Sequence, residues 1–245
     1  MEVKENERID DLEYNGLKII QNKDGFCFGM DSVLLSDFAK DIKKDANVLD
    51  LGTGTGILPI LLCGKTNLKK IIGVEIQKEV ADMASRSSAL NNLENRFEVI
   101  NCNILELEEK FQKGSFDAVI TNPPYKKDKT GKINENEIKK ISRHEITANL
   151  KDFIQVSSKM LKNNGALYMV HRPERLSEII TLFKEFNIEP KVLKLVQPNL
   201  EKNPNLVLIK GVKCGKTFLK TEKTLIVYNK DGTYTNEILK IYNKL

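Results

Sequence analysis

The sequence has no tryptophan, only two histidines and only four cysteines in 245 residues. The cysteines are Cys27, Cys63, Cys102 and Cys214, and no two of them form a C-x-x-C pair. Structural zinc sites are usually built from such pairs together with further cysteines or histidines. We therefore expect free, mostly buried thiols and no metal site.

Long apolar runs are also missing. The longest, Ile57 to Cys63, is far shorter than the ~18 residues that a membrane-spanning helix needs. The first residues are charged and lack the apolar stretch of a signal peptide, so we expect a cytoplasmic protein without a membrane segment. The net charge of +5 is compatible with an acidic partner such as RNA but does not require one.

What the sequence does contain is a regular alternation of short apolar runs and helical patterns. The expected strands are 47–51, 71–75, 97–100, 116–120 and 166–170, and the expected helices are 57–63, 78–90, 150–161 and 174–186. Strands that alternate with helices pair in parallel, in an open sheet covered by helices.

The C-terminal part follows another pattern. Residues 191–196 and 206–210 are strand-like, and the polar turn between them leaves no room for a helix, so we expect them to pair antiparallel. Asp231-Gly232 indicates a hairpin between 225–228 and 233–235. The expected fold is a doubly wound, mostly parallel seven-stranded α/β sheet with an antiparallel last strand and a small C-terminal hairpin.

We expect a single domain. Its core covers about 30–212, between an N-terminal lead-in, 1–29, and the C-terminal hairpin and helix, 213–245.

Three glycines, Gly52, Gly54 and Gly56, alternate in the loop after the first expected strand. Glycines let the backbone turn tightly and approach a ligand, and ligands bind beyond the carboxyl ends of parallel strands. A dinucleotide fingerprint needs a small residue where Ile57 stands, and no P-loop G-K-[ST] is present. The loop therefore favours S-adenosylmethionine over a dinucleotide or a nucleoside triphosphate.

Two further positions fit that cofactor. Glu75 ends the second expected strand, where a carboxylate can accept hydrogen bonds from both ribose hydroxyls. Asn103 and Ile104 follow the third strand and are placed to contact the adenine ring.

The fourth expected strand runs into Asn122-Pro123-Pro124-Tyr125. An aryl amine or an amide is a poor nucleophile because its lone pair is delocalised. Two acceptors, the Asn122 side-chain oxygen and a backbone carbonyl such as that of Pro123, can grip its two N–H groups and turn the lone pair toward a methyl donor. The prolines fix the backbone and donate no N–H, and Tyr125 offers a face for a planar substrate.

These residues resemble the Rossmann-like methyltransferases that act on amino nitrogens, among them adenine-N6 enzymes and glutamine-N5 enzymes of release factors. A narrower resemblance, to bacterial tRNA(Val) adenine-N6 methyltransferases, covers nearly the whole chain. It is carried by 7–12, 26–35, 143–145, 171–176 and 227–238.

The resemblance implies methylation of the adenine 3′ of the anticodon of a valine tRNA by a protein that we expect to be monomeric. The implied catalytic residues are Asn122, Pro123, Pro124 and Tyr125. The implied cofactor contacts are Phe28, Asp31, Ser32, Asp50, Gly52, Thr53, Gly54, Gly56, Glu75, Ile76, Asn103, Ile104 and Asn122. Asn103 replaces an aspartate common in related enzymes, but it can still accept a hydrogen bond from the adenine amino group.

Residues 126–140 are almost wholly polar and rich in lysine, which predicts a loop that leads into a helix. Lys139, Lys140 and Arg143 fall on one face of that helix, and this face would suit tRNA phosphates unless it is simply a solvated charged surface. The expected substrate contacts are Tyr125, Lys126, Lys127, Lys139, Lys140, Arg143 and His144. For His144, an RNA-contacting or structural role is favoured over that of a general base, and His171 is expected to be structural.

Three alternatives remain. A glutamine-N5 methyltransferase for a release factor shares the tetrapeptide, but such enzymes typically carry an N-terminal helical domain. A non-catalytic RNA-binding protein would not need both the tetrapeptide and the glycine loop. A dehydrogenase is disfavoured by Ile57.

Overall fold

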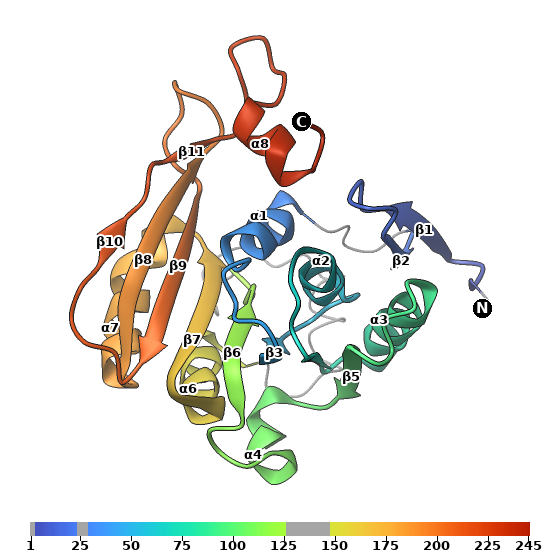
Figure 1. The fold of residues 1–245 in the computed structure, drawn as a ribbon, viewed down its shortest axis with the longest axis horizontal. Coiled ribbons are helices and arrows are strands. Elements are labelled where there is room, and N and C mark those ends of the chain that lie inside the picture. Colours follow the sequence, from blue (N-terminus) through green and yellow to red (C-terminus); the bar gives the residue numbers. More distant parts are fainter. Residues whose placement is uncertain (1–2, 24–28, 126–147) are drawn as a thin grey trace, which may run out of the picture.

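A large sheet organises the fold in the computed structural model, which describes residues 3–23, 29–125 and 148–245. Its strands are β3 (Asn47–Leu51), β4 (Lys70–Glu75), β5 (Phe97–Asn101), β6 (Phe116–Thr121), β7 (Leu161–His171), β8 (Ile188–Gln197), β9 (Leu206–Lys213), β10 (Lys220–Thr221) and β11 (Leu225–Ile226). They are arranged in the order β10-β8-β9-β7-β6-β3-β4-β5, and β11 also pairs with β8 (Figure 1). The sheet therefore contains the seven expected strands and two short additions at one edge.

The pairing directions confirm the expected topology. β5, β4, β3, β6 and β7 are mutually parallel, whereas β9 lies antiparallel between β7 and β8. β7 begins at Leu161, earlier than the expected 166, because the β6–β7 register shifts between Phe116 and Ala118 and allows pairing to extend.

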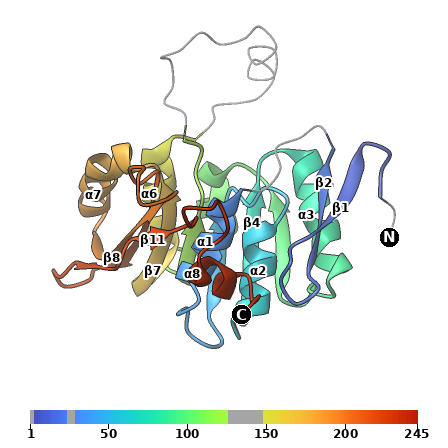
Figure 2. The same ribbon diagram turned by 90° about the horizontal axis from the view of Figure 1, so that it is seen from above.

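Helices cover both faces of this sheet. They are α1 (Met30–Phe38), α2 (Ile57–Lys65), α3 (Lys78–Leu90), α4 (Leu107–Lys110), α6 (Leu150–Met160), α7 (Leu176–Glu185) and α8 (Asn236–Ile241), with 3₁₀ turns η1 (Ile104–Glu106) and η2 (Pro173–Arg175). One buried cluster joins α1, α2, α3 and α8 to the sheet, and a second joins α4, α6 and α7 to it. Figure 2 shows α6 and α7 on one side of the sheet and α2 and α8 on the other.

The N-terminal segment, expected only as a lead-in, forms a hairpin of β1 (Glu7–Asp11) and β2 (Lys18–Asn22). It packs on α3, where the Ile20 backbone N–H donates to Ser87 Oγ at 2.9 Å and Arg86 pairs with Glu7. Ile19 and Ile20 are fully buried. The hairpin therefore belongs to the packed structure.

The C-terminal segment forms only part of the expected hairpin. Tyr228 pairs with Tyr234 in an isolated antiparallel bridge, while β11 joins the main sheet parallel to β8. The rings of Tyr228, Tyr234 and Tyr242 stack in succession, with centroids 5.3 and 6.0 Å apart. The hairpin thus depends on aromatic stacking as well as on backbone pairing.

None of the described helices combines the length and apolar character needed to cross a membrane. In 3–23, 29–125 and 148–245, no group of three or more histidine, cysteine, aspartate or glutamate side chains could hold a metal ion. Cys63 and Cys102 are free and buried, Cys214 is free and exposed, and Cys27 lies outside the described residues.

The order of the strands creates the site. β3 lies between β4, which follows it directly in the chain, and β6, which is the third strand after it. Open α/β sheets bind ligands at such a reversal, outside the carboxyl ends of the strands. Leu51 of β3 is in register with Thr121 of β6, and the Thr121 hydroxyl donates to the Leu51 carbonyl at 2.9 Å. The glycine loop and Asn122 therefore leave the sheet side by side.

Candidate cofactor and substrate site

A cavity of about 710 Å³ opens at this edge of the sheet. This volume lies within the range of about 300–1,000 Å³ common for small-molecule sites. The walls come from the glycine loop, the ends of β2 and β4, the first turns of α1, α2 and α3, and the residues after β5 and β6. Two smaller hollows, of about 230 and 300 Å³, lie elsewhere and contain none of the glycine-loop residues.

The glycine loop adopts a conformation that requires glycine at each alternate position. Gly52, Gly54 and Gly56 have φ angles of +73°, +57° and +93°, a region that side chains with a Cβ disfavour. The backbone N–H groups of Gly52 and Thr53 both donate to the Val74 carbonyl, at 3.0 and 2.9 Å. The loop is thereby fixed to the end of β4 and brings its backbone to the cavity.

Glu75 is buried at the end of β4 and faces this loop. Its Oε2 accepts from the Gly54 N–H at 3.0 Å, and its Oε1 accepts from the Gln77 N–H at 2.9 Å. Burial raises the pKa of Glu75, although these backbone N–H groups lower it again in part. The carboxylate thus holds the loop and lines the cavity at once.

Asp50 lies one layer deeper and is completely buried. Burial, together with the charge of Glu75, raises its pKa to about 7, while the nearby Thr53 hydroxyl acts in the opposite direction. Even so, neither Asp50 oxygen nor Thr53 Oγ1 has a hydrogen bond of ordinary geometry to any described residue. The end of β3 and the glycine loop therefore contain buried polar groups that lack well-formed hydrogen bonds to the described residues, which suits a segment that binds a polar ligand.

Asn122 is held by the start of α1. Its Nδ2 donates to Asp31 Oδ2 at 3.1 Å and approaches Ser32 Oγ at 3.5 Å. Its Oδ1 has no hydrogen-bond partner among the described residues. Asn122 and Ser32 both line the cavity, so a free side-chain acceptor is available beside it.

Tyr125 is fixed on the same side. Its hydroxyl donates to Asp31 Oδ2 at 2.8 Å, its ring centroid lies 5.1 Å from that of His171, and the Arg172 guanidinium lies 5.1 Å from its centroid. Burial raises the pKa of Tyr125, and the Asp31 carboxylate adds to this effect. The phenol therefore stays neutral and acts as a hydrogen-bond donor.

His171 is fully buried at the end of β7. Burial, together with the charge of Arg175, lowers its pKa to about 4. Its Nδ1 accepts from the Arg172 backbone N–H at 2.7 Å, so the neutral ring carries its proton on Nε2. This geometry gives His171 a packing role beside Tyr125, in agreement with the structural role expected for it.

Most of the expected site residues come together. Those that line the cavity are Ser32, Gly52, Thr53, Gly54, Glu75, Ile76, Asn103, Ile104, Asn122 and Pro124. Asp31, Asp50, Gly56, Pro123 and Tyr125 are absent from its lining but adjoin residues that form it. Phe28, Lys126, Lys127, Lys139, Lys140, Arg143 and His144 lie outside the described residues, so their roles stay predictions.

Sequence reasoning missed several lining residues. Gln21 and Asn22 reach the cavity from β2, Val80 and Met83 from α3, and Phe153 from α6. The apolar positions of α3 are spaced as on one helix face, which is a signal for burial, but nothing in the local sequence says that the ligand lies next to that face. Gln21 and Asn22 follow two consecutive isoleucines in a segment dismissed as charged lead-in.

The fold and this site define a Rossmann-like methyltransferase. A solved structure of a predicted O-methyltransferase from Agrobacterium tumefaciens superposes with a TM-score of 0.71 at 21% identity, covering 88% of this chain and 96% of that one. The family model of the methyltransferase small domain matches residues 28–191, and the chain belongs to this family.

Curated relatives cover almost the same length. The chain is 23% identical over 215 residues to a protein from Aeromonas hydrophila, covering 87% of each chain. It is 25% identical over 229 residues to one from Haemophilus influenzae, covering 91% of this chain and 92% of the relative. Both relatives are named tRNA1(Val) (adenine(37)-N6)-methyltransferase.

Proposed function

We propose that this protein transfers a methyl group from S-adenosylmethionine to the N6 amino group of an adenine in tRNA. The observation that carries the proposal is the orientation of Asn122. Its amide nitrogen is engaged by Asp31, and its oxygen, beside a cavity built on the glycine loop, accepts no hydrogen bond from the described residues. The names of the curated relatives support adenine N6 in tRNA as the target.

The residues of the cavity fit the cofactor. A Cβ at Gly54 would meet no atom within 4 Å, so the loop leaves open space where a ligand can approach the backbone. Glu75 offers a carboxylate for ribose hydroxyls, and Asn103 and Ile104 border the space for an adenine ring. When bound, S-adenosylmethionine supplies an electrophilic methyl group on a positively charged sulfur.

The chain supplies the activation of the amine. Asn122 Oδ1 and the Pro123 carbonyl oxygen accept no hydrogen bond from described residues. They can each accept one N–H of the target amine and favour a tetrahedral nitrogen whose lone pair points away from both. As the N–C bond forms and the bond between the methyl group and sulfur breaks, the nitrogen becomes acidic and releases one proton to water. Fixed acceptors of this kind stabilise the transition state without having to reorganise.

A planar base also suits the surroundings of Asn122. Tyr125 follows it in the chain, is partly exposed and has its hydroxyl fixed by Asp31. Stacking on such a ring contributes about 1–3 kcal/mol per base. This compensates for part of the few kcal/mol that withdrawing a base from its stack costs, a cost that is smallest in a single-stranded loop.

The target is the adenine 3′ of the anticodon in a valine tRNA, as the family resemblance implies, and the names of the relatives give adenine 37 of tRNA1(Val). Lys126, Lys127, Lys139, Lys140, Arg143 and His144 provide the contacts to the tRNA. The cavity of about 710 Å³ is too small to hold a tRNA, so most of the affinity comes from these residues.

A competition assay tests the proposal. Purified protein and methyl-labelled cofactor are incubated with total tRNA and a peptide chain release factor side by side. We expect label in tRNA and none in the protein fraction. Label on a glutamine of the release factor, with none in tRNA, would establish the glutamine-N5 reaction instead.

A further inference from the structure

The carboxylate of Asp31 receives three hydrogen bonds, and two of them come from the catalytic tetrapeptide. Its Oδ2 accepts from Asn122 Nδ2 at 3.1 Å and from the Tyr125 hydroxyl at 2.8 Å, while its Oδ1 accepts from the Ser32 backbone N–H at 2.9 Å. Asp31 lies in the first turn of α1, where the helix dipole favours a negative charge. One side chain of α1 thus connects to both functional side chains after β6.

The bond to Asn122 determines which end of its amide faces the cavity. An asparagine side chain ends in an acceptor oxygen and a donor NH₂ group of nearly the same shape. If the amide were turned by 180°, its oxygen would face the Asp31 carboxylate and its NH₂ would face an incoming amine. Both contacts would then be unfavourable, one between two acceptors and the other between two donors.

The backbone before α1 leaves room for this carboxylate. A Cβ placed on Gly29 would lie 2.5 Å from Asp31 Oδ1 and 3.3 Å from its Cγ. The third nearest atom is Asp31 Oδ2 at 3.7 Å, so the three nearest atoms all belong to this carboxylate. An alanine at position 29 would therefore meet the Asp31 carboxylate before any other described group and displace the end of this side chain.

We propose that Asp31 is a positioning residue for methyl transfer, which fixes the Asn122 amide with its oxygen toward the substrate amine and anchors Tyr125, and that Gly29 is required because it accommodates this carboxylate. This inference rests on the proposed methylation of an amino nitrogen. It differs from the direct cofactor contact that the family resemblance implies for Asp31.

Steady-state kinetics test the inference with three variants. Asp31→Leu has a similar shape but no acceptor, Asp31→Asn keeps one acceptor oxygen, and Gly29→Ala displaces the carboxylate. We expect kcat to fall roughly 10- to 100-fold in Asp31→Leu and in Gly29→Ala, and less in Asp31→Asn. The dissociation constant for S-adenosylmethionine and the KM for tRNA should each change by less than about two-fold, because only the transition state is affected.

The same two changes at Asp37 provide a matched control. Asp37 lies at the other end of α1, where its carboxylate pairs with Lys40 and Lys65. Its variants should keep the kcat of the original protein.

A second measurement does not depend on activity. In protein labelled with ¹⁵N-asparagine, the Nδ2 protons of Asn122 are assigned by their loss in Asn122→Ala. We expect one of them to be shifted downfield and protected from exchange by the carboxylate. Asp31→Leu and Gly29→Ala should abolish this signature, and the Asp37 variants should keep it.

Three outcomes would overturn the inference. The first is a weaker cofactor dissociation constant with kcat unchanged at saturation, which would make Asp31 a cofactor ligand. The second is an unchanged kcat in Asp31→Leu. The third is an Asn122 amide whose protons do not respond to Asp31. Because the amide signal is observed without substrate, a protein that failed to methylate tRNA would refute the proposed function while still allowing this inference to be tested.

Discussion

At the scale of single residues, Glu75 has two functions. Its carboxylate accepts the Gly54 and Gln77 backbone N–H groups and also lines the cavity. Burial makes this charge costly, as the raised pKa indicates, so hydrogen-bond donors from a ligand would stabilise it.

Removing this carboxylate should weaken cofactor binding. In Glu75→Ala we expect S-adenosylmethionine to bind about 1.5–3 kcal/mol more weakly, the scale of a hydrogen bond to a charged group. Isothermal calorimetry measures the change. Glu98→Ala is the control, because Glu98 is an exposed carboxylate on the neighbouring strand β5 that pairs with Lys70. Unchanged affinity in a folded Glu75→Ala protein would remove Glu75 from the site.

Asp50 makes stability depend on pH in a defined direction. Its pKa is about 7 in the folded protein, against an ordinary value of 3.8. Below about pH 4 the group is protonated in both states and has no effect. Between about pH 4 and 7 only the unfolded chain loses the proton, so stability falls as pH rises, and above about pH 7 the loss is complete.

Asp50→Asn should abolish that dependence. Because asparagine stays neutral, we expect the variant to gain stability relative to the original protein as pH rises from 4 to 8, by a few kcal/mol at most, on the order of 1.4 kcal/mol per pKa unit. Urea unfolding at a series of pH values measures this. Parallel pH profiles for the two proteins would mean that Asp50 is ionised in the folded state at all of these pH values.

At the scale of elements, the glycine loop contains glycines that are needed for two different reasons. Gly54 and Gly56 both have positive φ. A Cβ on Gly54 meets nothing within 4 Å, whereas a Cβ on Gly56 would lie 2.8 Å from the Phe97 ring. The space beside Gly54 is thus open to a ligand, whereas the Phe97 ring of β5 packs against Gly56 and leaves no room for a side chain there.

Three alanine variants distinguish these reasons. Gly16→Ala, in the β1–β2 turn with φ of +69° and no atom within 4 Å, should lose about 1–2 kcal/mol of stability from strain alone. Gly54→Ala should lose a similar amount of stability and also bind S-adenosylmethionine more weakly than Gly16→Ala does. Gly56→Ala should be about 1–3 kcal/mol less stable than either.

Chemical denaturation and cofactor titration of the three proteins provide the comparison. Equal stability of Gly54→Ala and Gly56→Ala would show that contact with Phe97 is unimportant.

The elements that the sequence predicted well are those specified by local pattern. β3, β4 and β6 are short apolar runs that end at or just before a glycine, an acidic residue or a proline. The sequence therefore predicted the order of these strands along the chain and the residues that follow their carboxyl ends. The cofactor side of the site was predictable for this reason.

The other features depend on contacts between distant parts of the chain. The β1–β2 hairpin is mostly polar, and contacts with α3 hold it in place. Ser87 of α3 accepts from the Ile20 backbone N–H, and Arg86 of α3 pairs with Glu7. Asp31 and Asn122 are likewise far apart in sequence, and only the parallel sheet brings the start of α1 to the end of β6. No local pattern could have predicted either contact.

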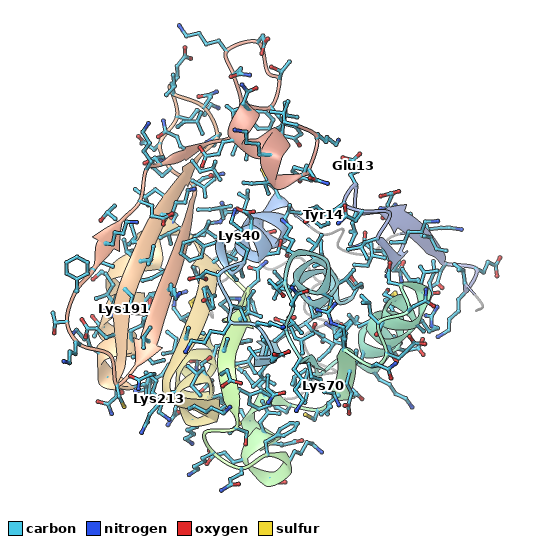
Figure 3. The ribbon with its side chains drawn as sticks, viewed as in Figure 1. Glu13, Tyr14, Lys40, Lys70, Lys191 and Lys213 are labelled. Carbon is cyan, nitrogen blue, oxygen red and sulfur yellow. The ribbon has the colours of Figure 1, made fainter. Side chains whose placement is uncertain are left out.

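At the scale of the whole molecule, the net charge of +5 is modest. For tRNA binding, the distribution of the positive charges matters more than their total. In the described part of the chain, positive charges lie on several elements. Figure 3 labels lysines from four different places, after α1 (Lys40), at the start of β4 (Lys70), in β8 (Lys191) and at the end of β9 (Lys213). Two lysine-rich stretches stand out in the sequence: 210–223, which lies in the described part, and 126–140, which begins directly after the tetrapeptide.

Salt dependence of tRNA binding tests the role of that segment. Each lost phosphate contact lowers the slope of log affinity against log salt by about one. Neutralising Lys139, Lys140 and Arg143 together should therefore lower it by about two to three. The control neutralises Lys216, Lys220 and Lys223, which are exposed and lie around β10 at the edge of the sheet, and should leave the slope unchanged. An equal effect from both sets would mean that tRNA attraction comes from overall charge.

The central claim is that Asn122 presents an acceptor that activates an exocyclic adenine amine. Nucleoside mass spectrometry of tRNA incubated with S-adenosylmethionine and purified protein tests it most directly. We expect N6-methyladenosine with the original protein. With Asn122→Ala we expect at least ~100-fold slower formation and nearly unchanged cofactor affinity. Methylation at a ring nitrogen or a ribose, or near-normal N6-methyladenosine formation by Asn122→Ala, would contradict the account.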